Sequence, residues 1–134
     1  MIALASHYGK GRIELKEIAK QENISLKYLE QVIIPLRTTG LVKAIRGSRG
    51  GYSLAKPPSE ISLHDLVEIL DGPLELIECL GNPTTCRRVQ TCTTRGIWKE
   101  VQEAISRVFH SVTLEDMLHR KSEREDPIPP MYQI

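Results

Sequence analysis

The chain has 134 residues, the size of one domain or of one domain with a dimerisation appendage, and its 40% hydrophobic content is enough for a core. It has neither a run of about 18 apolar residues nor the order of a signal peptide, so we expect a cytoplasmic protein without a membrane partner. The net charge of +1 divides into +6 over residues 1–56 and −5 over residues 57–134, which favours a polyanionic partner for the N-terminal part.

The first elements of the chain are short helices separated by tight turns. Residues 1–7 are apolar and typical of the end of a helix, and residues 15–20 form a second short helix after a glycine-containing break. Asn23 suits the left-handed conformation of the next turn, and Ser25 is a typical N-cap for a third helix, which Gly40 ends. Two short helices joined by such a turn indicate a helix-turn-helix.

A basic hairpin follows this motif. Residues 42–46 and 52–55 are strand-like and are joined by the Gly-Ser-Arg-Gly-Gly sequence of residues 47–51, which predicts a hairpin with a flexible tip. A phosphate-binding P-loop is not supported, because no Lys-Ser/Thr pair follows the glycines and no helix opens there. The hairpin therefore makes the predicted motif a winged helix-turn-helix.

The winged motif predicts where DNA is contacted. The third helix enters the major groove with its N-terminal side chains, and the wing contacts the backbone or the minor groove. Gln31 suits an adenine, Glu30 suits the cytosine amino group, and Lys27 suits a guanine or a phosphate. The alternatives are an ordinary helical hairpin with a polar face and, for Arg49, a solvated turn. The expected DNA-contacting residues are Ser25, Lys27, Tyr28, Glu30, Gln31, Arg46, Gly47, Ser48 and Arg49.

Three cysteines lie on a loop that contains glycine and proline. Cys79, Cys86 and Cys92 are an odd number of thiols, which disfavours a disulfide framework, and their spacing suits an iron–sulfur cluster or a zinc ion. The alternative is three buried, inert thiols. Either metal group needs a fourth ligand, for which the conceivable donors are Glu75, Glu78, His7 and His64.

The C-terminal part predicts a dimerisation surface. A helix capped by Ser62 precedes the cysteine loop, and a long helix over residues 94–111 and a shorter one from Thr113 to Arg120 follow it. One apolar stripe recurs along the long helix, and we expect it to form the seam of a homodimer; an intramolecular core helix is the alternative. The stripe consists of Trp98, Val101, Ile105, Val108 and Val112.

The sequence does not indicate a catalytic site. Ser62, His64 and Asp65 are close in sequence, but Ser62 is accounted for as a helix cap, and neighbouring residues face different directions on a helix. We therefore expect no enzymatic activity.

The predicted fold class is mostly α-helical with a small β-hairpin wing and a long C-terminal dimerisation helix. We expect a winged helix-turn-helix in residues 1–58 and a linking helix with the cysteine loop in residues 59–93. Dimerisation helices follow in residues 94–120, and a flexible tail in residues 121–134.

Several motifs resemble a known family in the family's order. These include Ile24-Ser25-Leu26-Lys27-Tyr28-Leu29-Glu30-Gln31, Gly50-Gly51-Tyr52-Ser53-Leu54, Asp71-Gly72-Pro73 and the three cysteines. The chain resembles the dimeric winged-helix regulators that include IscR, NsrR and CymR. The resemblance implies a bacterial repressor that reads a palindromic promoter site on double-stranded DNA as a homodimer.

The resemblance also implies a cofactor. Cys79, Cys86 and Cys92 would hold an iron–sulfur cluster, with [2Fe–2S] favoured over [4Fe–4S], and the cluster would sense redox state, iron or cluster supply, or nitric oxide. The alternative is a cluster-independent or zinc-stabilised regulator that acts through a protein partner, as in the control of cysteine metabolism.

The chain departs from this family at two places. IscR-like members have a histidine three residues after the last cysteine as the fourth ligand, and this chain has Arg95 there. The chain also begins later than other members, without a segment that supplies a ligand from the partner subunit in some of them, so we expect a first helix shortened at its N-terminus. The fourth ligand is therefore unassigned.

Overall fold

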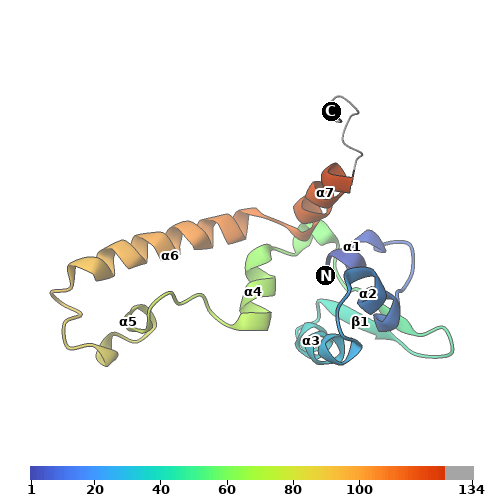
Figure 1. Ribbon diagram of the computed structural model, residues 1–134, viewed down its shortest axis with the longest axis horizontal. Coiled ribbons are helices and arrows are strands. Elements are labelled where there is room, and N and C mark those ends of the chain that lie inside the picture. The colour runs from blue at the N-terminus through green and yellow to red at the C-terminus, as the bar shows by residue number, and fades with distance from the viewer. Residues whose placement is uncertain (126–134) are drawn as a thin grey trace, which may run out of the picture. The chain divides into compact units, whose positions relative to one another are not determined.

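The computed structural model describes residues 1–125 (Figure 1). The chain divides into two compact units, one formed by residues 1–61 with residues 113–125 and the other by residues 62–112. The described residues are mostly helical, with one two-stranded antiparallel sheet. The predicted fold class is therefore confirmed.

The helix-turn-helix forms the beginning of the first unit. Helix α1 spans Ile2–Ser6, α2 spans Leu15–Glu22, and α3 spans Leu26–Thr38. Asn23 takes the left-handed conformation with φ of 53°, and the backbone N–H of Ile24 donates to the carbonyl of Ala19 at 3.0 Å. This turn redirects the chain from α2 into α3.

The wing is a hairpin whose first strand packs beside α3. Strand β1 (Val42–Ile45), which lies beside α3 in Figure 1, pairs with β2 (Gly51–Leu54), and the pairing places Val42 opposite Leu54. Ile13 forms an additional antiparallel bridge with Tyr52. A Cβ atom on Gly51 would lie 2.8 Å from the carbonyl oxygen of Ile13, so this close approach requires glycine. The bridge holds the segment before α2 against the wing.

The core of the first unit is closed by a helix from the far end of the chain. Helix α7 (Leu114–Glu125) packs on α1 and on the 3₁₀ helix η1 (Pro58–Glu60), and Leu114 is fully buried. The other fully buried large side chains are Ile13 and Ile61. Helix α7 therefore belongs to the winged unit, whereas residues 94–120 were expected to form one dimerisation element.

Helix α7 also extends further than the expected boundary at residue 121. The Lys121 Nζ lies 3.7 Å from the Glu125 carboxylate, one turn further along α7, and 3.9 Å from the carboxylate of Glu22 on α2. Residues 121–125 are thus helical, and the expected flexible tail is wrong for them. Residues 126–134 lie outside the described residues.

The second unit contains the linking helix, the cysteine loop and the long helix. Helix α4 (Leu63–Asp71) begins with a capping box between Ser62 and Asp65. Short turns follow, α5 (Glu78–Gly81) and the 3₁₀ helix η2 (Pro83–Thr85), and then α6 (Thr93–Ser111). Both α4 and α5 contact α6. Within residues 1–125, no helix is long and apolar enough to cross a membrane.

Candidate functional site

Helix α3 presents a polar surface. It begins at Ser25, whose Oγ accepts a hydrogen bond from the backbone N–H of Tyr28 at 3.0 Å. Ile33 and Leu36 are buried, and they hold the opposite face of the helix against the core of the unit. The residues predicted to read DNA from this helix are all exposed, namely Ser25, Lys27, Tyr28, Glu30 and Gln31.

Glu30 differs in position from the other predicted contacts on α3. It lines a groove of about 340 Å³ to which α3, the start of α2 and the wing contribute. Leu26 lines the groove from α3, Glu14 and Lys16 from the start of α2, and Ser48 from the wing. Glu30 therefore lies on the wing side of α3, whereas Lys27 and Gln31 lie on its outward face.

The wing tip carries the predicted cations Arg46 and Arg49, and two further cations lie beside it. Arg46, Gly47, Ser48 and Arg49 are all exposed. Ser48 and Arg49 share a groove of about 380 Å³ with Lys10 and Arg12, which come from the segment before α2. The sequence did not predict Lys10 and Arg12 as DNA contacts, because a bridge between residues distant in sequence, Ile13 and Tyr52, brings that segment to the wing.

The three cysteines come from three different turns. Cys79 lies in α5, Cys86 directly follows η2, and Cys92 is the N-cap of α6. All three thiols are free; Cys86 is exposed and the other two are half-buried. Three soft thiolates suit iron or zinc. Within residues 1–125, however, no three cysteine, histidine or acidic side chains are grouped closely enough to hold a metal ion. The donor chemistry fits a cluster, but the described arrangement does not assemble one.

Arg95, three residues after Cys92, connects α6 with α5. Its Nη2 donates to the carbonyl of Cys79 at 3.4 Å, and its Nε is buried without a hydrogen-bond partner among the described residues. The Thr94 hydroxyl, 3.2 Å from the Cys92 sulfur, and the backbone N–H of Arg95 hold the pKa of the Cys92 thiol below its ordinary value. The start of α6 therefore favours a thiolate.

Helix α6 exposes most of its predicted seam. No residue of this 19-residue helix is buried, and Trp98, Val101 and Val108 are 44%, 40% and 56% exposed. Ile105 is half-buried. Val112 lies beyond the last helical residue and is only 8% exposed, so its assignment to the seam is wrong. Ile97, which was not predicted, is 57% exposed.

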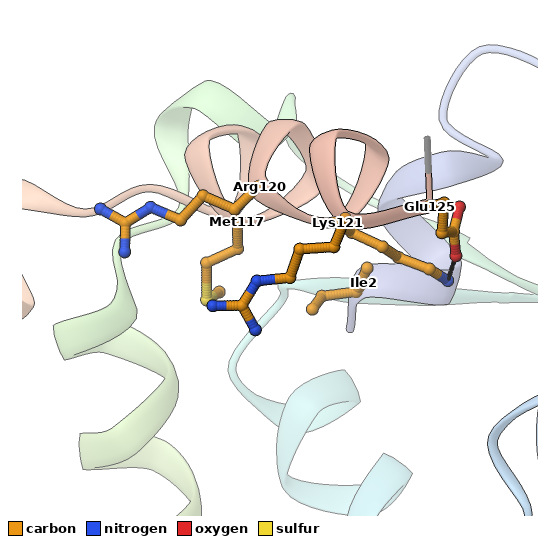
Figure 2. A pocket seen from close by; sticks show the side chains of 6 residues that line it. Ile2, Met117, Arg120, Lys121 and Glu125 are labelled. Carbon is orange, nitrogen blue, oxygen red and sulfur yellow. Dashed lines mark ion pairs between the residues drawn. The ribbon is translucent and has the colours of Figure 1, made fainter. Parts of the chain in front are cut away.

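A separate groove of about 400 Å³ lies in the first unit, lined by α1 and α7 (Figure 2). Ile2 and Met117 provide its apolar surface, and Arg120 and Arg124 contribute cations. Figure 2 shows the Lys121 side chain directed toward Glu125, its ion-pair partner. None of the residues predicted to bind DNA or metal lines this groove.

The comparisons with known proteins identify the family. The family Rrf2, described as “Iron-dependent Transcriptional regulator”, matches residues 1–120. The chain belongs to the Rrf2 family. An Rrf2-type relative, the HTH-type transcriptional regulator CymR of Bacillus subtilis, is 40% identical over 117 residues, which are 87% of this chain and 80% of that protein. The HTH-type transcriptional regulator IscR of Serratia proteamaculans is 33% identical over 121 residues, 90% of this chain and 73% of that protein.

Solved Rrf2-type structures share the fold. The structure of T. potens IscR superimposes with a TM-score of 0.77 at 37% identity, over 98% of this chain and 86% of that one. The structure of CymR, the global cysteine regulator of B. subtilis, has a TM-score of 0.72 at 38% identity, over 89% of this chain and 87% of that one. The chain is thus a transcriptional regulator with a DNA-binding winged helix, and these relatives are regulators rather than enzymes.

Proposed function

We propose that the chain is a cytoplasmic, homodimeric repressor that reads a two-fold symmetric operator through α3 and the wing. The observation that carries this proposal is the joint exposure of the N-terminal face of α3 and the cations of the wing tip. Lys10 and Arg12 support it, because together with Arg49 they outnumber the two carboxylates, Glu14 and Glu17, that line the same groove. Phosphate contacts by these cations would position the reading helix.

Different side chains of α3 recognise different bases. Gln31 pairs with adenine through its amide, and Lys27 donates to a guanine or a phosphate. Glu30 accepts from a cytosine amino group on the wing side of the helix, where this residue lines the groove shared with Ser48. Arg46 and Arg49 contribute affinity for any sequence, because they meet the DNA backbone.

The dimer rests on the exposed apolar face of α6. Although α4 and α5 contact this long helix, none of its residues is buried, so it has little of the packing that stabilises helices in water. A second copy of the helix would cover Trp98, Val101 and Val108. On a two-fold symmetric operator, the reading helices of the two subunits would enter major grooves about 34–36 Å apart, one turn of DNA.

The test of DNA reading uses duplexes selected from a random pool by the wild-type protein. Gln31→Ala should lose discrimination at one base pair per half-site by about 1–3 kcal/mol. Gln90→Ala is the matched control, because Gln90 is also exposed but lies in the cysteine loop. Arg49→Ala should weaken binding to all duplexes and flatten its salt dependence. Unchanged discrimination in Gln31→Ala would contradict the assignment of α3.

A second, finer proposal concerns the cysteines: Cys79, Cys86 and Cys92 bind an iron–sulfur cluster, [2Fe–2S] rather than [4Fe–4S], whose state sets the affinity for DNA. The family's description as iron-dependent and the accessible thiols support it. When bound, such a cluster supplies a centre that responds to redox state, iron supply or nitric oxide. Because the described arrangement does not group the thiols, binding requires the loop over residues 78–92 to rearrange.

The cluster is tested by anaerobic reconstitution with iron and sulfide assays. The wild-type protein should take up one cluster per subunit, Cys86→Ala should not, and the neighbouring Thr91→Ala should behave as wild type. A full cluster in Cys86→Ala would contradict the ligand assignment. Equal affinity of the loaded and cluster-free forms for a selected duplex would show that the cluster does not control DNA binding. It would then favour the alternative of a cluster-independent or zinc-stabilised regulator that acts through a protein partner.

A further inference from the structure

An isoleucine is exposed on the outward face of α3. Ile34 is 59% exposed, and no other large apolar side chain in residues 1–125 has a larger exposed fraction. Because an α-helix has about 3.6 residues per turn, one stripe along α3 contains Lys27, Gln31, Ile34 and Thr38. The buried Ile33 and Leu36 lie on the opposite side. Ile34 is thus the single apolar member of the stripe proposed to face DNA.

The surroundings of Ile34 favour a polyanionic partner. Ile34 lines a groove of about 450 Å³ together with Arg37 and Thr38 of α3 and Val42, Lys43 and Ala44 of β1. Neither Arg37 nor Lys43 forms an ion pair with any described residue. Two free cations beside an exposed apolar side chain oppose the docking of an ordinary apolar protein surface, whereas they complement DNA phosphates.

The major groove of DNA offers one apolar group to such a side chain. Only thymine presents a methyl group there, and apolar side chains contact it in sequence-specific complexes. Ile34 follows Gln31 by three residues, which is a rise of about 4.5 Å along the helix. Base pairs are spaced by about 3.4 Å, so the two side chains reach neighbouring base pairs.

We propose that Ile34 is a specificity-determining residue that packs against the 5-methyl group of a thymine next to the base pair read by Gln31. This inference rests on the proposed DNA-binding function. Ile34 would then select thymine by burying a methyl group, while Arg37 and Lys43 hold the phosphates that flank the groove.

The test removes the methyl group and nothing else. Duplexes selected from a random pool by the wild-type protein are resynthesised with each thymine replaced singly by deoxyuridine, and Kd is measured for each. For the wild-type protein, one deoxyuridine per half-site should raise Kd about four-fold, the value of one buried methyl group. Ile34→Ala should bind the unmodified duplex more weakly by a similar or larger factor and should not respond to that deoxyuridine.

Two controls separate recognition from folding. The exposed Ile34 contributes little to the core, so Ile34→Ala should keep the wild-type Tm. Ile45→Ala truncates an isoleucine on β1 that is also exposed, and it should retain the wild-type response to deoxyuridine. A full deoxyuridine penalty in Ile34→Ala would overturn the inference, as would a wild-type protein that responds to no deoxyuridine. A pool that yields no preferred sequence would instead overturn the proposed function itself, and the inference with it.

Discussion

The Oγ of Ser25 accepts a hydrogen bond from the backbone N–H of Tyr28 at 3.0 Å. This contact satisfies one of the free N–H groups at the start of α3 and fixes the first turn of the helix. The hydroxyl can still donate its own proton. Ser25 can therefore cap the reading helix and donate to a DNA phosphate at the same time.

The helix cap formed by Ser25 should contribute measurably to the free energy of unfolding. Ser25→Ala should lower the free energy of unfolding by about 1 kcal/mol, because it leaves the Tyr28 N–H without its partner. Ser25→Asn should keep most of the stability, because asparagine is an equally good cap. Urea denaturation of the three proteins measures the difference. Equal stability of the alanine and wild-type proteins would contradict the role of the cap.

The turn between α2 and α3 depends on the conformation of Asn23, whose φ is 53°. A β-branched residue is strained there, so Asn23→Val should destabilise the protein by about 1–2 kcal/mol. Asn23→Gly should be close to neutral, because glycine adopts this conformation without strain. The Tm values of the two variants test this, and an equal effect of glycine and valine would contradict the role of the left-handed conformation at Asn23.

The start of α7 should confer a dependence of stability on acidic pH. Hydrogen bonds from the backbone N–H and the hydroxyl of Thr113 hold the pKa of Asp116 below its ordinary value. The pKa of Asp116 is lower in the folded state than in the unfolded state, where it is about 4. The stabilisation is therefore fully present above the unfolded pKa. It is lost as the pH falls through the folded pKa.

The variant Asp116→Asn isolates this carboxylate. It should be less stable than the wild-type protein at pH 7, and the difference should shrink as the pH falls below about 4. Glu115→Gln is the control, because Glu115 neighbours Asp116 and is exposed. A constant difference between Asp116→Asn and the wild-type protein across this pH range would show that Asp116 does not titrate as described.

The apolar face of α6 should control the oligomeric state. Val101→Asp places a charge in the proposed seam and should shift the protein to a monomer at micromolar concentration, because a desolvated charge is costly. Lys99→Asp places the same residue on the polar face of α6, and this variant should remain a dimer. Sedimentation velocity distinguishes these states. A monomeric wild-type protein would exclude the seam.

Most of the fold could be predicted from signals that are local in the sequence. The features that depend on contacts between residues distant in sequence could not be predicted. Asn23, Ser25, Ser62 and Thr113 mark turns and caps through their own chemistry, so the helices they border were predictable. The extension of α7 was not, because α7 packs on α1, which comes from the other end of the chain.

The candidate site shows the same limit. Val112 matches the spacing of the seam, but spacing alone does not reveal that α6 ends at Ser111. Lys10 and Arg12 could not be assigned to the wing because a bridge between distant residues, Ile13 and Tyr52, brings them there. The exposure of Ile34 likewise depends on how α3 packs, which its apolar character does not reveal.

The most direct test of DNA reading compares one selected duplex with a scrambled duplex of the same composition at physiological salt. The wild-type protein should bind the selected duplex at least about 10³-fold more tightly, as specific regulators do. Equal affinity for the two duplexes would contradict sequence-specific reading by α3 and the wing.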